Sequence, residues 1–515
     1  MTETVGRFSL FGALACFALA MGGSVTGFKV AEVLFTPAVL LSLVWVGTLL
    51  VLHYRPLVID VHGSAQWASL AEVKAWTKGN EGKNGAQVEL GSASEGRRSM
   101  PLAWKTDKHV LIVASARSGK GADLIIPNLL AYNGSVFVLD PKGENARATQ
   151  RHRATLGPVH CLDPWGLTGQ PTARFNPLRR LSQPGNEDDI ATGAAALAAA
   201  LVLPDNGNNR YFSDSARQLI EALIAYAVTD ENLRPVADLK LVRILLTLHP
   251  RPALEAMSRT TTGPDTIRSN AGRMLALGER EFGQILSSAV TETAFLDDPR
   301  LQNALSAQDE RQIDFAAWRT GTASVFLCLP APYFKSFNRW LRLVVTSALD
   351  EMMRQHRPPP KPVLFILDEL ATLERLQPVE DAIGLASGYG VQLWPIFQDI
   401  GQLKDIYKEK WSSFVGNAGI RLFFGTQDYA TAQEVSRLLG NETRQTEMMR
   451  GGEVTDLRLD KRELLTPDEI MSMDERDMIT FLPQISGTRV RPILTRRVRY
   501  FEDPRFNGLW DDPRS

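Results

Sequence analysis

Two long apolar runs dominate the first 54 residues. No charged side chain occurs from residue 8 to 28 or from residue 33 to 52. Each run is about 20 residues long, which is the length that a helix rising ~1.5 Å per residue needs to cross ~30 Å of hydrocarbon. The pattern predicts a transmembrane helical hairpin over residues 1–54, with its turn at residues 29–32. A cleaved signal peptide is the alternative for the first run.

The charges beside these runs favour one orientation. Arg7 and Arg55 flank the pair of runs on one side, whereas Lys29 lies in the turn between them. Positively charged residues gather on the cytoplasmic side of a membrane. We therefore expect the N-terminus and the large C-terminal body to be cytoplasmic.

After Pro56, short apolar runs alternate with helical segments. A strand, a helix and a second strand in this order form a βαβ unit, and such units build a parallel sheet covered on both faces. The sequence therefore predicts an α/β fold with a parallel-rich sheet. A polar, glycine-rich run over residues 78–98 is expected to precede its first strand. We expect strands at residues 110–114, 135–140, 323–329, 363–367, 391–397 and 420–424.

The stretch from residue 185 to 302 has a different pattern of apolar and polar residues. Its apolar residues recur with helical spacing, and β-branched runs are few. We predict an all-α domain, residues 185–302, inserted between two parts of the α/β domain, residues 55–184 and 303–515. Its helices are expected over residues 191–201, 213–228, 238–248 and 266–277.

Composition sets broad limits on the kind of protein. The chain has 515 residues, of which 44% are hydrophobic, and a formal net charge of −1. It can bury a large core in more than one folded unit, and any contact with DNA must come from local patches or a channel rather than a global basic field. Cys16, Cys161 and Cys328 lack metal-site spacing, so reduced thiols are expected.

Residues 110–121 join an apolar strand to a loop of small residues that ends in Gly-Lys-Gly. The phosphate-binding pattern G-x-x-x-x-G-K-[ST] works because backbone N–H groups surround phosphate oxygens and the lysine reaches the outer phosphates. Ala114 replaces the first glycine, and Gly121 replaces the hydroxyl residue that contacts the metal. Water, Ser115 or Ser118 would have to supply that oxygen. We assign nucleotide binding to Ala114, Ser115, Ala116, Arg117, Ser118, Gly119, Lys120 and Gly121.

A second apolar strand, residues 363–367, ends in Asp368 and Glu369. In nucleoside triphosphatases a strand-terminal Asp holds Mg²⁺, and an adjacent Glu polarises the attacking water. The two halves together predict a site for ATP and Mg²⁺, with Asp368 as the metal residue. An ordinary βα turn at residues 114–121 is the alternative, but it leaves the distant carboxylates unexplained. Asp140 ends another strand, where proximity to the site and a helix-capping role both remain open.

Seven short motifs follow one another along nearly the whole chain. They are HGSAQWA from His62, SGKG from Ser118 with IPNLL from Ile126, LDPKGE from Leu139, LDE from Leu367, FQ from Phe397, FGTQD from Phe424 and LLTPDEI from Leu464. In this order they resemble the TraG-type coupling proteins of type IV secretion. That family shares the glycine after the loop lysine, so Gly121 favours the resemblance and does not argue against ATP binding.

The resemblance implies a membrane-anchored, homo-hexameric ATPase with a RecA-like P-loop domain, distantly related to FtsK-type DNA pumps. It implies a multi-pass protein of the bacterial inner membrane with a large cytoplasmic domain. Such a protein receives a relaxase–DNA complex or protein effectors and passes them to the secretion channel components. In that family nucleotide binds at subunit boundaries, and an all-α domain at the cytoplasmic mouth recognises substrate.

The resemblance also implies roles for individual residues. Lys120 would contact the β- and γ-phosphates, Asp368 would hold Mg²⁺, and Glu369 would activate water. Gln398 resembles the polar sensor of the γ-phosphate, and a helix-capping amide is its alternative. Candidates for the arginine that one subunit offers to its neighbour are Arg375, Arg421 and Arg339, each of which could instead form surface salt bridges.

Two basic stretches are candidates for contact with DNA phosphates. Solvated charge is the alternative for both. In a hexamer one basic side chain per subunit becomes a ring of six, so a near-neutral chain can still line a pore for DNA. The stretches are Arg147, Arg151, His152 and Arg153, and then Arg489, Arg491, Arg496, Arg497 and Arg499.

Two classes of function remain open at this point. The first is a motor that couples ATP hydrolysis to movement of DNA or protein. The second is a nucleotide-gated docking platform that recruits cargo without pumping. An FtsK-type chromosome pump is disfavoured because the sequence shows only two apolar spans, no long Pro/Gln linker and no recognisable C-terminal winged-helix module.

Overall fold

The computed structural model describes residues 61–513 except residues 82–83, 204–206, 208–209, 309, 355–356, 451–452 and 485–489. The predicted transmembrane hairpin, residues 1–54, lies outside the described residues, as does Cys16. Within the described part, no helix combines the length and apolar character needed to cross a membrane. The chain divides into two units: residues 1–64 with 442–462, and residues 65–441 with 463–515.

The described part of the first unit is built around a β-hairpin. Strands β10 (Asn441–Arg450) and β11 (Glu453–Glu463) form a two-stranded sheet. Residues 62–64 lie beside the start of β10, where Ser64 pairs with Glu442 and the Thr443 N–H donates to the Gly63 carbonyl over 3.1 Å. This hairpin was not among the predicted strands.

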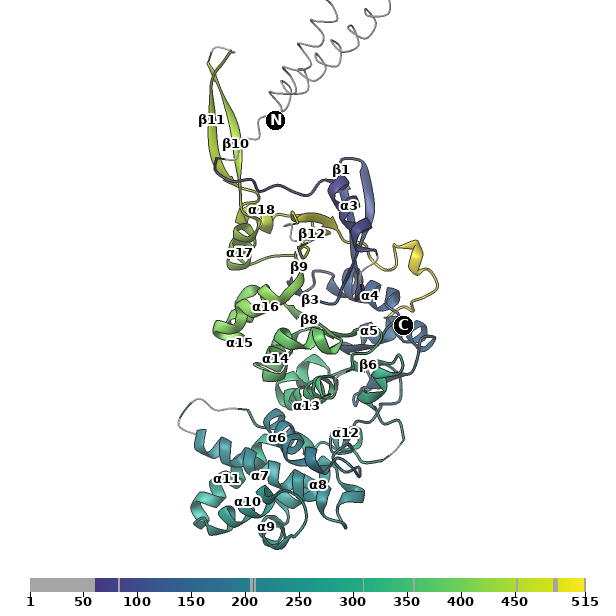
Figure 1. Cartoon of the computed structure of the whole chain (residues 1–515), viewed down its shortest axis with the longest axis vertical. Helices are drawn as coiled ribbons and strands as arrows, with labels where there is room; N and C mark the ends of the chain where they lie inside the picture. The colour runs from purple at the N-terminus through teal and green to yellow at the C-terminus, as the bar shows by residue number, and fades with distance from the viewer. Residues whose placement is uncertain are drawn as a thin grey trace, which may run out of the picture. The chain divides into compact units, whose positions relative to one another are not determined.

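The second unit contains an eleven-stranded sheet, counted over the described residues, in the order β2-β1-β13-β12-β9-β3-β8-β7-β4-β6-β5 (Figure 1). The strands from β9 to β5 in this order are parallel, which confirms the parallel-rich sheet. The strands are β1 (Ala86–Glu95), β2 (Arg98–Thr106), β3 (His109–Ala114), β4 (Val136–Leu139), β5 (Val159–Leu162), β6 (Ser324–Leu327), β7 (Val363–Leu367), β8 (Val391–Phe397), β9 (Ala418–Phe424), β12 (Asp477–Phe481) and β13 (Ile493–Arg496).

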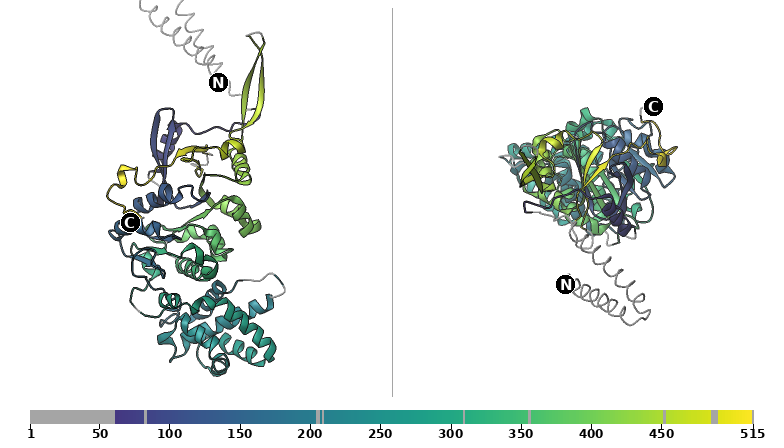
Figure 2. Two further views of the ribbon diagram at one scale, coloured as in Figure 1. Left: turned by 180° about the vertical axis from the view of Figure 1, so that it is seen from behind. Right: turned by 90° about the horizontal axis from the view of Figure 1, so that it is seen from above.

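The other four strands form an antiparallel extension that the sequence analysis missed. The run from residue 78 to 98, expected to be a separator, contains most of β1, which pairs with β2 and with the C-terminal strand β13. The purple and yellow segments that adjoin in Figures 1 and 2 are these N- and C-terminal parts. Strands β1 and β2 form a local hairpin, with Glu95 opposite Arg98, but they lack a continuous apolar run, and β13 joins β1 only through long-range pairing.

Helices cover both faces of the parallel strands. Alternate residues along β7 enter two different cores, with Val363, Phe365 and Leu367 on one face and Leu364 and Ile366 on the other. Successive side chains of a strand point to opposite faces, so a strand buried on both sides is apolar throughout. The covering helices are α13 (Phe334–Met353), α14 (Gln377–Leu385) and α16 (Trp411–Asn417) on the first face, and α4 (Ile126–Ala131) and α5 (Glu144–Ala154) on the second. Helix α3 (Leu70–Asn80) packs on the antiparallel strands β1 and β2.

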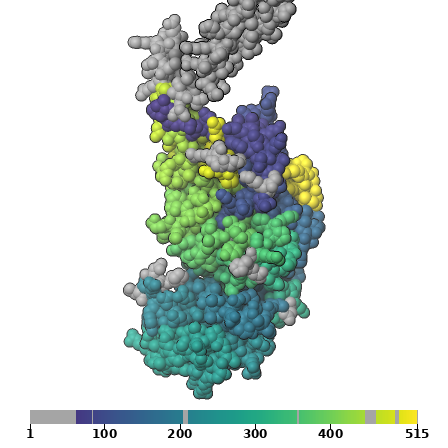
Figure 3. Space-filling model, viewed as in Figure 1, coloured from purple at the N-terminus to yellow at the C-terminus, as the bar shows by residue number. Residues whose placement is uncertain are grey.

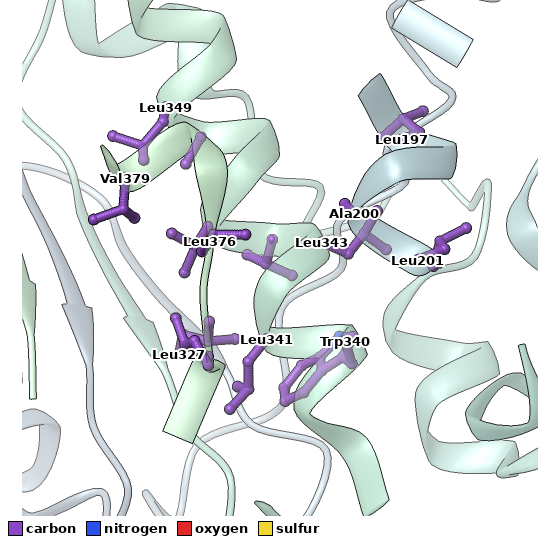
Figure 4. Packing of buried hydrophobic residues seen from close by; sticks show 14 of the residues in the cluster. Leu197, Ala200, Leu201, Leu327, Trp340, Leu341, Leu343, Leu349, Leu376 and Val379 are labelled. Atoms are coloured by element: carbon purple, nitrogen blue, oxygen red, sulfur yellow. The ribbon is translucent and has the colours of Figure 1, made fainter. Parts of the chain in front are cut away.

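Between β5 and β6 the described chain is mostly helical from residue 187 to residue 304. Figure 1 shows this group in blue to teal, and Figure 4 shows α6, with Leu197, Ala200 and Leu201, beside α13, with Leu343 and Trp340 in the same apolar cluster. The helices belong to the same compact unit as the sheet because this apolar contact is continuous with the sheet's core. They are α6 (Ile190–Leu201), α7 (Arg210–Thr229), α8 (Leu239–Thr247), α9 (Pro250–Arg259), α10 (Asp265–Ala276), α11 (Glu279–Glu292) and α12 (Pro299–Ala304).

The parallel strands all end at one edge of the sheet, and most of the residues that follow them are polar. In parallel α/β sheets this edge is where ligands bind. The fold thus collects side chains that are far apart in the sequence. In sheet order the residues are Gly425, Ser115, Gln398, Asp368, Asp140, Cys328 and Asp163.

A buried arginine, Arg497, holds the loop after β3 in place through an ion pair and a hydrogen bond. The Arg497 guanidinium lies 2.8 Å from Asp123 Oδ2 and donates a 2.8 Å hydrogen bond to the Ser118 carbonyl. It also lies 4.0 Å from the centre of the Phe424 ring. Arg497 follows β13, so the C-terminal strand fixes a loop that lies 379 residues earlier in the sequence.

We expect Arg497→Ala to lower the free energy of unfolding by about 3–5 kcal/mol, because it leaves the Asp123 carboxylate buried without its closest cation. Urea unfolding followed by tryptophan fluorescence measures the loss. Arg496→Ala is the matched control: its side chain is 52% exposed, and its ion pairs should contribute about 1 kcal/mol or less. An equal loss of unfolding free energy in the two variants would contradict the stabilising role of Arg497.

Gly425 supplies a second prediction. Its φ of +59° is left-handed, and a Cβ there would lie 2.6 Å from Ser118 Cβ. Gly425→Ala should therefore lower the melting temperature, through a conformational penalty of roughly 1–2 kcal/mol and displacement of the loop. Gly416→Ala, in helix α16 with nothing within 4 Å of a new Cβ, should leave it unchanged or slightly higher. Unaltered melting of the Gly425 variant argues against the close approach.

Candidate nucleotide-binding site

The loop after β3 has the backbone of a tight phosphate-binding turn. Ala114 is the last residue of strand β3, where any L-residue fits, so the first glycine of the usual pattern is not needed. Arg117 and Gly119 have positive φ values of 61° and 85°. Ser118 Oγ donates a 2.7 Å hydrogen bond to the Ser115 carbonyl. The chain then enters a short π-helix, Gly121–Ile125, that continues into α4.

The four residues assigned to the chemistry lie together. Lys120 Nζ is 3.1 Å from Asp368 Oδ1 and 2.8 Å from Glu369 Oε1. Gln398 Nε2 donates to the other Glu369 oxygen, Oε2, over 2.8 Å. The structure thus brings together Lys120 from the first motif, the carboxylates after β7 and the amide after β8. Gln398 does not cap the next helix through its side chain, because Asp399 caps α15 (Ile400–Tyr407).

Burial governs the charges in this cluster. It raises the pKa of Asp368, although Lys120 acts in the opposite direction. Burial alone would lower the pKa of Lys120, but the Asp368 and Glu369 carboxylates outweigh it and raise that pKa above its ordinary value. The ammonium therefore keeps its proton and partly neutralises two acids at the sheet edge.

The donor set fits Mg²⁺ that arrives with a phosphate ligand. Asp368 Oδ1 is buried, and its contact with Lys120 is an ion pair without hydrogen-bond geometry. No group of three or more His, Cys, Asp or Glu side chains among the described residues could hold a metal ion alone. Mg²⁺ is usually bound through one or two carboxylates, with phosphate oxygens and water completing its shell.

Asp140 combines the two roles that the sequence left open. Its Oδ2 accepts a 2.8 Å hydrogen bond from the Ala146 N–H at the start of α5, and its Oδ1 accepts one of 3.2 Å from Asn145 Nδ2. It also follows β4 directly beside Asp368, because Leu139 pairs with Leu367. Desolvation raises the pKa of Asp140 to about 7, and the Asp368 carboxylate adds to this shift.

A cavity of about 300 Å³ opens on the β9 side of the loop. Residues 115–119 line it together with Phe424, Gly425, Met471 and Met473. The acids lie on the other side of β3, where β8 and then β7 follow in the sheet. The loop therefore has a carboxylate-rich side and an open, partly apolar side.

The candidate arginines for a neighbouring site all have partners within the chain. Arg375 pairs with Glu380 over 2.9 Å, and Arg339 pairs with Glu292 over 2.6 Å. Arg421 lies 5.0 Å from the centre of the Phe481 ring. The identity of an arginine supplied between subunits stays a prediction.

The predicted DNA stretches need correction. Arg153 and Arg497 are buried, with 0% and 2% exposure, and therefore cannot meet a DNA backbone. Arg147 donates to the Pro513 carbonyl and Arg151 to Asp511, so the first stretch holds the C-terminal segment. Figure 3 shows that segment, in yellow, against the blue part of the surface. A basic run looks the same in sequence whether its side chains bind solvent, DNA or backbone carbonyls.

The remaining basic residues are also engaged. His152 hydrogen-bonds the Leu130 carbonyl over 3.0 Å. Arg491 lies 3.2 Å from Glu72, Arg496 lies 3.2 Å from Asp477, and Arg499 lies 3.6 Å from Asp123. Arg489 is outside the described residues.

Sequence reasoning missed Asp123 and Asn145 beside the loop and assigned Arg497 to DNA contact instead. Asp123 and Arg497 form the ion pair that holds the loop, and Asn145 lies beside Gly121. A helix that follows a strand at this edge has its first-turn side chains near the site. The position of Asn145, just after the strand that ends at Leu139, could therefore have indicated its proximity. Nothing local could indicate that Arg497 reaches back to Ser118. The buried thiols of Cys161 and Cys328 are free, as expected.

Comparison with known proteins gives consistent relatives. A family model described as "Type IV secretory system Conjugative DNA transfer" matches residues 62–513. The conjugal transfer protein TraG of Agrobacterium fabrum is 27% identical over 390 residues, which cover 72% of this chain and 58% of that protein. The coupling protein VirD4 of Bartonella henselae is 26% identical over 400 residues, covering 73% and 61%.

Solved structures of the conjugative coupling protein TrwB share the fold. A trigonal form with sulphate has a TM-score of 0.60 and 15% identity, covering 84% of this chain and 92% of that chain. A TrwB complex with ADP and Mg²⁺ has a TM-score of 0.55 and 15% identity, covering 84% and 94%. Because the family model matches most of this chain, the chain belongs to the type IV secretory system conjugative DNA transfer family.

Proposed function

We propose that this protein is an ATP-driven coupling protein, which binds ATP with Mg²⁺ between residues 114–121 and the acids after β7. Hydrolysis would drive delivery of a relaxase–DNA complex or protein effectors to a type IV secretion channel. The observation that carries the proposal is the contact of Lys120 with both Asp368 and Glu369. TrwB, which shares the fold, has been solved with an ATP analogue and with ADP and Mg²⁺.

Each residue has a distinct role in this proposal. Lys120 contacts the β- and γ-phosphates, and Asp368 holds the Mg²⁺ position. Glu369, freed from the lysine, orients and deprotonates the attacking water, while Gln398 keeps its carboxylate in place through the 2.8 Å hydrogen bond. Mg²⁺ supplies charge compensation for the phosphates when bound. The cavity beside residues 115–119 offers room for another part of the nucleotide.

The wider assembly is part of the proposal. Residues 1–54 anchor the protein in the bacterial inner membrane, six subunits form a ring, and helices α6–α12 recruit cargo. A docking platform that recruits cargo without pumping is the second candidate. The same helices, α6–α12, would recruit cargo for this platform, which would need nucleotide only for its assembly.

Hydrolysis by full-length protein in detergent separates the two candidates. Lys120→Ala should abolish ATP binding. Glu369→Gln should keep ATP affinity within a few-fold yet lower turnover about 100-fold or more, because it removes the general base. Glu279→Gln, whose side chain is 89% exposed in α11, and Lys361→Ala are controls that should resemble wild type.

Transfer in cells decides the outcome. Donor cells carrying Glu369→Gln should lose transfer if hydrolysis drives delivery. If that variant transfers at the wild-type frequency, the motor hypothesis is rejected in favour of the docking platform. An absence of ATP binding in the wild-type protein would remove both candidates.

The membrane anchor gives a separate prediction. Deleting residues 1–54 should release a soluble protein that forms rings less readily, because two-dimensional confinement by the anchor raises the local concentration of subunits. Sedimentation velocity measures the assembly, and a transfer assay measures function. A truncated protein that still supports transfer argues against the anchor's role.

A further inference from the structure

Gly121 leaves a space at the position where phosphate-binding loops usually carry a hydroxyl. In the pattern G-x-x-x-x-G-K-[ST] that hydroxyl reaches Mg²⁺. Gly121 has no positive φ, and the closest atom to a Cβ built on it is Asn145 Oδ1, at 3.9 Å. The backbone could therefore carry a serine, and the neighbouring oxygen belongs to the side chain of Asn145.

Asn145 is held in place from one end. The residue is 5% exposed, in the first turn of α5, and its Nδ2 donates to Asp140 Oδ1 over 3.2 Å. In its ionised form the Asp140 carboxylate only accepts hydrogen bonds, so it selects the N–H₂ end of the amide. The carbonyl oxygen Oδ1 is left on the side that faces Gly121.

Asp140 connects this amide to the proposed metal position. Strands β4 and β7 are parallel neighbours with Leu139 opposite Leu367. Asp140 and Asp368 are the next residues on these strands, and neighbouring strands lie about 4.8 Å apart. The Asp140–Asn145 pair therefore borders the carboxylate that is proposed to hold Mg²⁺.

The serine hydroxyls of the loop lie on the opposite side. Ser115 and Ser118 line the cavity beside β9, and a Cβ on Gly425 would lie 3.2 Å from Ser115 Oγ. Ser118 Oγ points to the Ser115 carbonyl. The expectation that one of these serines replaces the missing hydroxyl is thus less well supported than a replacement by Asn145.

We propose that Asn145 Oδ1 supplies the protein oxygen toward Mg²⁺ that Gly121 lacks, and that Asp140 is the positioning residue that orients it. Amide carbonyl oxygens suit hard cations such as Mg²⁺. The inference rests on the proposed function, because it requires a magnesium-bound nucleotide at this loop.

The test is the affinity for ATP with and without Mg²⁺, measured by calorimetry on the full-length protein in detergent. In the wild type Mg²⁺ should tighten ATP binding. Asn145→Ala should reduce that tightening about 10-fold, the scale expected for a group that supports a metal site. Its affinity for ATP in EDTA should stay at the wild-type value, because Lys120 and the loop are intact.

A rescue variant separates a metal role from a structural one. Asn145→Ala combined with Gly121→Ser should recover the Mg²⁺ effect, since the new hydroxyl takes the position that the glycine leaves open. Asn80→Ala is the matched control: Asn80 is also a buried asparagine, but it bonds the Lys105 backbone near the opposite sheet edge. Thermal melting without nucleotide checks the fold of each variant.

The outcomes are distinct. A wild-type Mg²⁺ effect in Asn145→Ala overturns the inference and leaves the proposed function standing. Loss of ATP affinity in EDTA as well, without rescue by Gly121→Ser, assigns Asn145 a structural role and also overturns it. No ATP binding by the wild type in either condition would instead defeat the proposed function.

Discussion

The contact of one buried ammonium with two carboxylates organises the functional edge of the sheet. Asp368 and Glu369 are consecutive, and their side chains are only 14% and 21% exposed, so their charges would repel without a cation between them. Lys120 meets both, and one positive charge against two negative ones leaves a formal charge of −1. A divalent cation is attracted to such a cluster, and an anionic phosphate can then replace the carboxylates as the ion-pair partner of Lys120.

Topology makes this contact possible. Lys120 and Glu369 are 249 residues apart in the sequence, and helices α6–α12 form much of the intervening chain. Parallel strands nonetheless end at one edge, so β3, β8 and β7 deliver their following residues to the same place. Arg497 then holds the loop from the C-terminal side through Asp123 and Ser118. The loop's shape thus depends on strands at both ends of the unit.

The sequence predicted the parts of the site that short motifs encode. Lys120, Asp368, Glu369 and Gln398 each follow an apolar strand, and the carboxyl ends of parallel strands meet at one edge of a sheet. The pairing of β1 with β13 escaped prediction because its partners are about 400 residues apart, as Ser92 and Arg496 show. Burial of Arg153 and Arg497 escaped it too, since a basic side chain bonded to buried groups has the same local sequence as a solvated one.

The most direct test of the account is a structure of the full-length protein with Mg²⁺ and a non-hydrolysable ATP analogue. In that complex Lys120 Nζ should leave at least Glu369 and contact the β- and γ-phosphates, and the metal should lie between Asp368 and the same phosphates. Triphosphate density away from residues 114–121, or a lysine that keeps both carboxylate contacts beside a bound nucleotide, would contradict it.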